Sequence, residues 1–257
     1  MNTVYVTDGS FEGMLSAVYD SWYFRQDNVL NILPGMPEQP DFLITYKPVK
    51  TNEAKAAKVF DAVVSKISGD AARRLMLCWF SEQQDAGRII LNYLRFGFSI
   101  GPQVEEMVVH KFVKPMHDAA GRVGFEAHRM MGLLRFYKTK QDWYCAVIEP
   151  QHYILPMLAE HFADRMADSR WMIYDRGREL TAAFENGEWN VVPGRLIDTV
   201  GMQRNEDAYQ DMWRRYFDAM AIETRLNRNL QRHFMPKLYW KHLVENPNGA
   251  LIKAMKL

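Results

Sequence analysis

Glu126 and His128 are the clearest candidates for acid-base chemistry in the sequence. The segment from Phe125 to Tyr137 is rich enough in aromatic and apolar residues to predict a β-strand. Because residues two apart on a strand share a face, the carboxylate and the imidazole could orient each other as an acid-base pair or ligate a metal. The alternative is a structural hydrogen bond beside the core, since an active site needs a third group that sequence cannot place.

The remaining histidines and the cysteines give weaker signals. Glu106 and His110 have helical i, i+4 spacing and could supply half a metal site, although the alternative is a solvated helix face. His161 could act as a base, or it could be a half-buried histidine bonded to a backbone carbonyl. Cys78 and Cys145 lie among apolar residues, so we expect them to pack in the core rather than act as nucleophiles. We expect no metal and no cofactor.

Arginines form two groups that could contact nucleic acid. On the expected strand, Arg129 and Arg135 share a face with apolar and aromatic residues, a mixture typical of proteins that bind single strands or flipped bases. Residues 201–257 hold ten basic and six acidic residues, and a helix from Glu206 to His233 would gather four arginines on one side. These four are Arg214, Arg225, Arg228 and Arg232. We expect both groups to bind phosphates, and the alternative is that carboxylates pair with them.

Helical and strand patterns alternate along the chain in three stretches. A short strand at residues 5–6 precedes helices up to about residue 120, one with Thr51 as its N-cap and another opening at Gly101-Pro102. The middle stretch, residues 121–200, contains strand patterns, a helix opening at Pro156 and a hairpin signal at Asn186-Gly187. The last 57 residues return to helical spacing.

This order predicts an α+β fold in a single compact unit of residues 1–257. An antiparallel sheet in the central third, residues 121–200, would pack with a helical layer from residues 1–120 and another from residues 201–257. Such a sheet would present Glu126, His128 and the first two arginines on its surface.

Composition excludes several classes of protein. With 48% hydrophobic and 13% aromatic residues, the chain is neither disordered nor fibrous, and its net charge of +1 gives no overall attraction to nucleic acid or membranes. No uncharged run approaches the ~20 residues of a membrane span, and the start lacks the pattern of a signal peptide. Two distant cysteines make no disulfide framework. We therefore expect a cytoplasmic protein without membrane contact. Walker, GxGxxG, GxSxG, HExxH, EF-hand and CxxC motifs are absent from the sequence.

Six stretches together resemble one uncharacterised bacterial family of DNA-metabolism proteins, built on a domain of unknown function. None of the stretches is a catalytic signature, so they point to the family better than to a reaction. The six stretches are residues 5–13 (YVTDGSFEG), 126–136 (EAHRMMGLLRF), 161–165 (HFADR), 171–175 (WMIYD), 221–227 (AIETRLN) and 235–240 (MPKLYW).

The resemblance implies a role in DNA repair or modification beside a radical-SAM protein assigned to the same process. Some relatives carry a uracil-DNA-glycosylase-like domain after this one, and because the chain ends at Leu257 and has no CxxxCxxC cluster motif, we expect neither chemistry here. Our leading hypothesis is an accessory protein that binds DNA or positions it for the radical-SAM partner. One alternative is an enzyme acting on a nucleotide or damaged base through Glu126 and His128. Another is a protein adaptor with exposed rings such as Tyr239 and Trp240.

Overall fold

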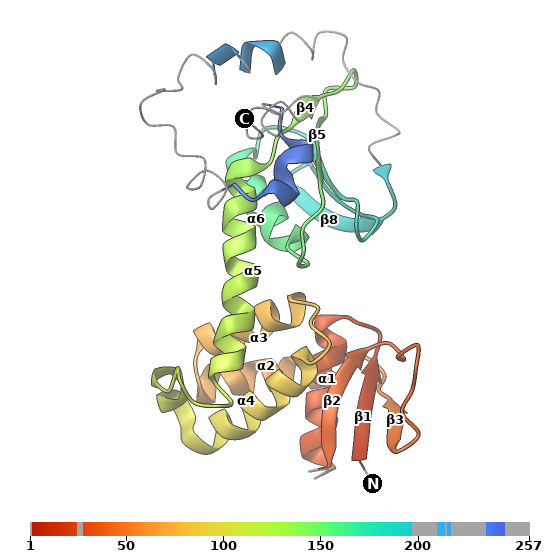
Figure 1. Ribbon diagram of the computed structural model, residues 1–257, viewed down its shortest axis with the longest axis vertical. Coiled ribbons are helices and arrows are strands. Elements are labelled where there is room, and N and C mark those ends of the chain that lie inside the picture. The colour runs from red at the N-terminus through yellow and green to blue at the C-terminus, as the bar shows by residue number, and fades with distance from the viewer. Residues whose placement is uncertain (1, 25–27, 197–209, 214, 217–234, 245–257) are drawn as a thin grey trace, which may run out of the picture. The chain divides into compact units, whose positions relative to one another are not determined.

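The computed structural model in Figure 1 describes residues 2–24, 28–196, 210–213, 215–216 and 235–244. Its helices and two sheets confirm the α+β class. The chain divides into two compact units, Met1–Gly124 and Phe125–Leu257, and the boundary falls within one helix, α5 (Lys114–Leu133). The arrangement of residues 1–257 as a single compact unit stays a prediction.

Three parallel strands form the sheet of the first unit. β1 (Asn2–Thr7) lies between β2 (Val29–Pro34) and β3 (Ile44–Pro48). The chain passes from β1 to β2 through α1 (Phe11–Tyr23), and a helical crossover of this kind makes neighbouring strands parallel. The side chain of Ser10 caps α1 by accepting a hydrogen bond from the backbone of the first turn. The strand and helix expected at the start are confirmed, and β2 was not predicted.

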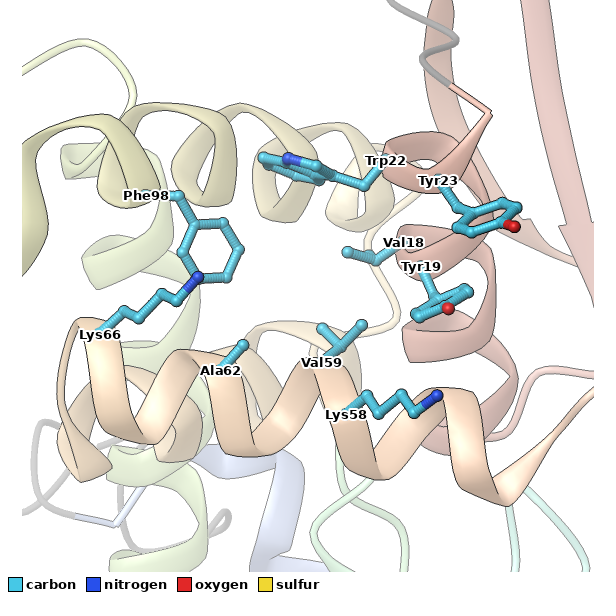
Figure 2. A pocket seen from close by; sticks show the side chains of 9 residues that line it. All are labelled: Val18, Tyr19, Trp22, Tyr23, Lys58, Val59, Ala62, Lys66 and Phe98. Carbon is cyan, nitrogen blue, oxygen red and sulfur yellow. The ribbon is translucent and has the colours of Figure 1, made fainter.

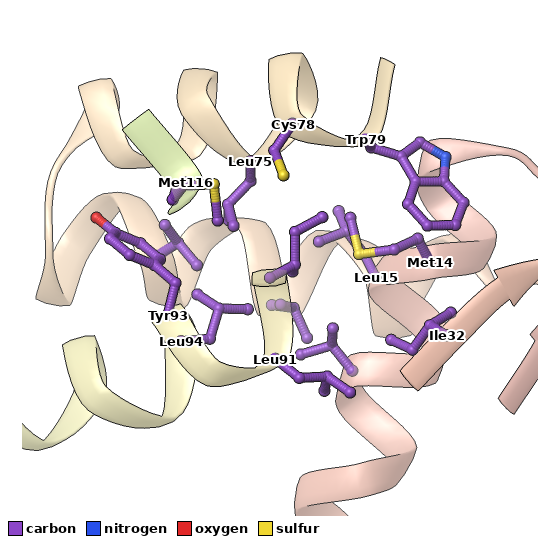
Figure 3. Close-up of a cluster of buried hydrophobic side chains, with 14 of the residues drawn as sticks. Met14, Leu15, Ile32, Leu75, Cys78, Trp79, Leu91, Tyr93, Leu94 and Met116 are labelled. Atoms are coloured by element: carbon purple, nitrogen blue, oxygen red, sulfur yellow. The ribbon is translucent and has the colours of Figure 1, made fainter. Parts of the chain in front are cut away.

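Three amphipathic helices complete the first unit at the predicted apolar spacing. Thr51 was expected to cap the first of them, but Asn52 does so, and the Thr51 hydroxyl instead donates a hydrogen bond to Asp8. Figure 3 shows the core they share, where Met14 and Leu15 of α1 meet Leu75 and Leu91. The helices are α2 (Glu53–Lys66), α3 (Gly69–Phe80) and α4 (Ala86–Ile100).

Two expectations for the segment after α4 are wrong. The helix opening at Gly101-Pro102 is a short 3-10 helix, η1 (Gly101–Glu106), and α5 begins only at Lys114. The strand expected from Phe125 is instead the second half of α5. The reason is that the side chains buried there recur with helical rather than alternating period; they are Val123, Ala127, Met130 and Leu134.

The second unit contains a mixed rather than an antiparallel sheet. β5 (Tyr144–Ile148) and β6 (Trp171–Asp175) pair in parallel because α6 (Leu155–Arg165), the helix expected at Pro156, connects them as a crossover. The other pairings are antiparallel, and the hairpin predicted at Asn186-Gly187 is confirmed. The sheet order is β4-β5-β6-β7-β8, with β4 (Tyr137–Lys138), β7 (Leu180–Glu185) and β8 (Glu188–Pro193).

The C-terminal stretch is described in two pieces. Residues 210–213 and 215–216 are helical, and η4 (Lys237–His242) is a 3-10 helix that follows Pro236. The rest of the helix expected from Glu206 to His233 lies outside the described residues. Among the helices that the structure describes, none is long and apolar enough to cross a membrane.

Candidate functional site

Glu126 lies in α5 as a buried carboxylate with three hydrogen-bond donors. Only 4% of the residue is exposed. Its Oε1 accepts hydrogen bonds from the backbone N–H of Gln151 at 2.8 Å and from the phenol of Tyr239 at 2.6 Å. Its Oε2 accepts a third hydrogen bond, from the backbone N–H of His152 at 2.8 Å. The carboxylate therefore joins α5 to the loop after β5 and to η4.

The environment of Tyr239 suits a hydrogen-bond donor rather than an acid. Burial raises the pKa of the phenol, and the hydrogen bond to Glu126 and its negative charge raise it further. The half-buried Arg129 guanidinium beside the phenol opposes this rise in pKa. Because Tyr239 keeps its proton, it donates to Glu126 throughout the neutral pH range.

His128 does not join this cluster. Residues two positions apart on a helix point in directions about 200° apart around its axis. Accordingly, His128 is exposed whereas Glu126 is buried. The prediction that Glu126 and His128 share a strand face is therefore wrong. The acid-base pair was inferred from that shared face, so its geometric basis is lost.

The loop after β5 is also held from its other side, by Arg178. Its guanidinium binds the Asp175 carboxylate at 2.9 Å and donates to the backbone carbonyls of Pro150 and Gln151 at 3.4 and 3.2 Å. Burial is the largest influence on Asp175 and raises the pKa of its carboxyl, whereas Arg178 acts to lower it. The backbone of Gln151 is thus bonded through its N–H by Glu126 and through its carbonyl by Arg178.

Glu149, at the start of the same loop, adds a link to η4. Its carboxylate lies 3.5 Å from the Arg176 guanidinium and 3.2 Å from Nε2 of His242. Together with the bonds from Glu126 and Arg178, these contacts fix residues 149–152 to three other segments: α5, the turn after β6, and η4. Sequence analysis missed this network because its partners are backbone groups and side chains far away in the chain.

Arg135 lies at the end of α5, where it has two kinds of contact. One guanidinium nitrogen donates to the carbonyls of Gly132 at 2.9 Å and Leu134 at 3.2 Å, so the cation lies where the helix dipole is negative. The guanidinium also lies 5.4 Å from the ring centroid of Trp213. Arg129 and Arg135 were expected on a strand face and lie instead on α5 and just after it. Arg214, Arg225, Arg228 and Arg232 lie outside the described residues.

The ring of Trp213 beside Arg135 is exposed, and so is the neighbouring ring of Tyr216. Trp213 is 39% exposed, and Tyr216, 55% exposed, has its ring centroid 5.7 Å from that of Trp213. We call Arg135, Trp213 and Tyr216 the Trp213 surface. A cation beside exposed, flat rings can contact both the phosphates and the bases of a nucleic acid.

The cysteines and the other two candidate histidines lie in packed surroundings. Cys78 and Cys145 are buried free thiols, and burial raises the pKa of each to about 12. His110 stacks on Phe96 with ring centroids 4.0 Å apart, and His161 is half-buried beside the ring of its neighbour. Across the part of the chain that the structure describes, no three His, Cys, Asp or Glu side chains are grouped to hold a metal ion.

Fold and site together define an α+β protein whose second unit is held by the buried carboxylates of Glu126 and Asp175 and exposes the rings of Trp213 and Tyr216. The chain belongs to the family of the domain of unknown function DUF4130, whose model matches residues 84–245. The match runs from the end of the loop before α4 to the segment after η4, so it contains Glu126, Arg178 and the Trp213 surface. None of the curated proteins matches the chain.

Proposed function

We propose that the protein is an accessory protein of DNA repair or modification that binds DNA through the Trp213 surface. The observation that carries the proposal is the guanidinium of Arg135 beside the exposed ring of Trp213. Arginine is a common phosphate ligand, and base-aromatic stacking contributes about 1–3 kcal/mol per base.

The state of Glu126 favours binding over catalysis. A general base must reach a substrate, but this carboxylate is almost completely buried and both of its oxygens already accept hydrogen bonds within the fold. The enzyme that would act on a nucleotide or damaged base through Glu126 and His128 is therefore the weaker alternative. The adaptor alternative loses the rings it relied on, because Tyr239 and Trp240 are buried.

The partner in this proposal is a radical-SAM protein of DNA repair, to which the bound DNA would be presented. A uracil-DNA-glycosylase-like protein is a second candidate partner. Both come from the family resemblance of the sequence, and the DNA-binding surface is the part of the proposal that can be tested on this chain alone. Arg214, Arg225, Arg228 and Arg232, which lie outside the described residues, stay predicted phosphate contacts.

The test is fluorescence anisotropy with labelled single- and double-stranded DNA at low salt. We expect Arg135→Ala and Trp213→Ala each to weaken binding about tenfold, the loss of roughly one good contact. Arg170→Ala is the matched control, because Arg170 lies at the same 5.4 Å from a tryptophan ring, that of half-buried Trp143. It should change the affinity less than about twofold.

Two results would overturn the proposal. One is that the wild-type protein does not bind DNA at low salt. The other is that Arg135→Ala and Arg170→Ala weaken binding equally, because then charge alone rather than the Trp213 surface matters. Unchanged melting temperatures are required for each variant, since Arg135 also bonds the last carbonyls of α5.

A further inference from the structure

A groove in the first unit lies between α1 and α2, with one ring from α4 closing an end (Figure 2). Its volume of about 500 Å³ lies within the range of small-ligand sites. Every one of its nine lining residues is aromatic, aliphatic or a lysine, and none is acidic. They are Val18, Tyr19, Trp22, Tyr23, Lys58, Val59, Ala62, Lys66 and Phe98.

The rings of this groove are exposed beyond what core packing requires. Trp22 is 42% and Tyr23 69% exposed, although both lie on the helix that carries the core stripe. Trp22 meets Phe98 edge to face with centroids 5.2 Å apart, and Tyr23 stacks on Tyr19 at 5.8 Å. The two ring pairs lie on opposite sides of the groove, and the side chains of Val18 and Val59 lie between them (Figure 2).

Two lysines place positive charge at the ends of the groove. Nζ of Lys58 lies 5.8 Å from the ring centroid of Tyr19, and Nζ of Lys66 lies 6.0 Å from that of Phe98. The two residues are eight positions apart on α2, or about 12 Å along the helix axis. In the described part of the chain neither forms an ion pair, and the nearby Asp20 is bound by Lys55 at 2.6 Å.

We propose that this groove binds unpaired bases of single-stranded DNA, with Lys58 and Lys66 contacting the flanking phosphates. The rings offer flat surfaces on which bases can stack, and the lysines offer positive charge for the phosphates. No acidic residue lines the groove to repel them. An amphipathic protein helix would find apolar walls here but would leave both lysines unused. This inference rests on the proposed function, because it assumes that the ligand is DNA. It assigns the DNA to a surface other than the Trp213 surface.

The experiment measures anisotropy of a labelled oligothymidylate and of a labelled duplex with the full chain. We expect Trp22→Ala and the double variant Lys58→Glu/Lys66→Glu each to weaken oligothymidylate binding at least tenfold, while duplex binding changes less than about threefold. Trp22→Phe keeps an aromatic ring at this position and should therefore retain most of the wild-type affinity. The double variant Lys50→Glu/Arg73→Glu changes the net charge equally at exposed positions outside the groove and should have the smaller effect.

The outcomes separate this inference from the proposed function. If oligothymidylate binding is lost on Arg135→Ala but unaffected by both groove variants, the groove does not hold DNA and the proposed function stands. If the two charge-reversal variants weaken binding equally, the lysines act only through net charge and the inference fails. If the wild-type protein binds neither probe, both proposals fail.

Discussion

The phenol of Tyr239 donates a 2.6 Å hydrogen bond to the buried carboxylate of Glu126, a residue 113 positions earlier in the chain. This bond ties η4, near the end of the chain, to α5. The same carboxylate holds the backbone of Gln151 and His152, so one side chain connects three segments that are distant in sequence. The Glu126 side chain therefore cross-links these segments of the fold.

Replacing Glu126 should destabilise the second unit. In Glu126→Gln one carboxylate oxygen becomes an NH₂ group, which cannot accept the hydrogen bonds that Glu126 accepts. We expect the free energy of unfolding to fall by about 3 kcal/mol, because at least one buried donor loses its acceptor. Urea denaturation measures the change.

Tyr239→Phe provides the comparison, since it removes one donor and leaves both backbone bonds in place. A smaller loss, about 1.5 kcal/mol, is expected. If Glu126→Gln were as stable as wild type and yet abolished a reaction on nucleotides, Glu126 would be a catalytic residue and our interpretation of it would be wrong.

Arg178→Ala should destabilise the protein more at neutral than at acidic pH. Burial raises the pKa of Asp175 above 3.8, so the folded state takes up a proton more readily than the unfolded chain, and stability from this group falls as pH rises. Without Arg178 the pKa rises further and the fall extends to higher pH. We expect a loss of about 3 kcal/mol near pH 7 and a clearly smaller one near pH 4.

The control for this pH dependence is Asp175→Asn combined with Arg178→Ala, which removes both charges. Its loss of stability relative to wild type should lack the increase between acidic and neutral pH that Arg178→Ala shows. If Arg178→Ala lost the same stability at both pH values, the ionisation of Asp175 would not depend on Arg178.

Gly87 should tolerate no side chain. A Cβ there would overlap the backbone oxygen of Ile32, so α4 would have to move away from β2. Gly87→Ala should therefore cost at least 2 kcal/mol, at the upper end of overpacking effects. Gly121→Ala in α5 has open space and should stabilise by about 0.5–1 kcal/mol. Thermal unfolding of the two variants distinguishes them, and similar melting temperatures would contradict the close approach.

Both thiols should be unreactive in the native protein. With pKa values of about 12, Cys78 and Cys145 hold almost no thiolate near neutral pH, and both are buried. An aromatic disulfide reagent should label them only after urea is added. Rapid labelling of either thiol without denaturant would point to a reactive cysteine that the structure does not show.

Apolar spacing and turn residues correctly predicted the helices and hairpins that neighbouring residues determine. The stripe of α1, the hairpin at Asn186-Gly187 and the helix at Pro156 follow from apolar spacing or from turn and helix-start residues, and all three are confirmed. The strand–helix–strand order around Pro156 also contained the signal for a parallel pair, and the antiparallel prediction overlooked it.

The candidate site was harder to predict because its geometry depends on long-range contacts. Phe125 to Leu133 is apolar enough for a strand or a helix, and the spacing of Val123, Ala127, Met130 and Leu134 favours the helix that forms. That difference in period turns Glu126 inward and His128 outward. The partners of Glu126 are two backbone N–H groups and Tyr239, and no sequence motif marks a backbone donor.

The measurement that tests the central claim most directly is a salt titration of DNA affinity, with wild-type protein and Arg135→Ala compared on the same single-stranded and duplex probes. If the protein binds DNA through phosphate contacts, log affinity falls linearly with log salt, and the slope for Arg135→Ala is shallower by about one. An affinity below detection at low salt, or a slope that Arg135→Ala leaves unchanged, would contradict the account.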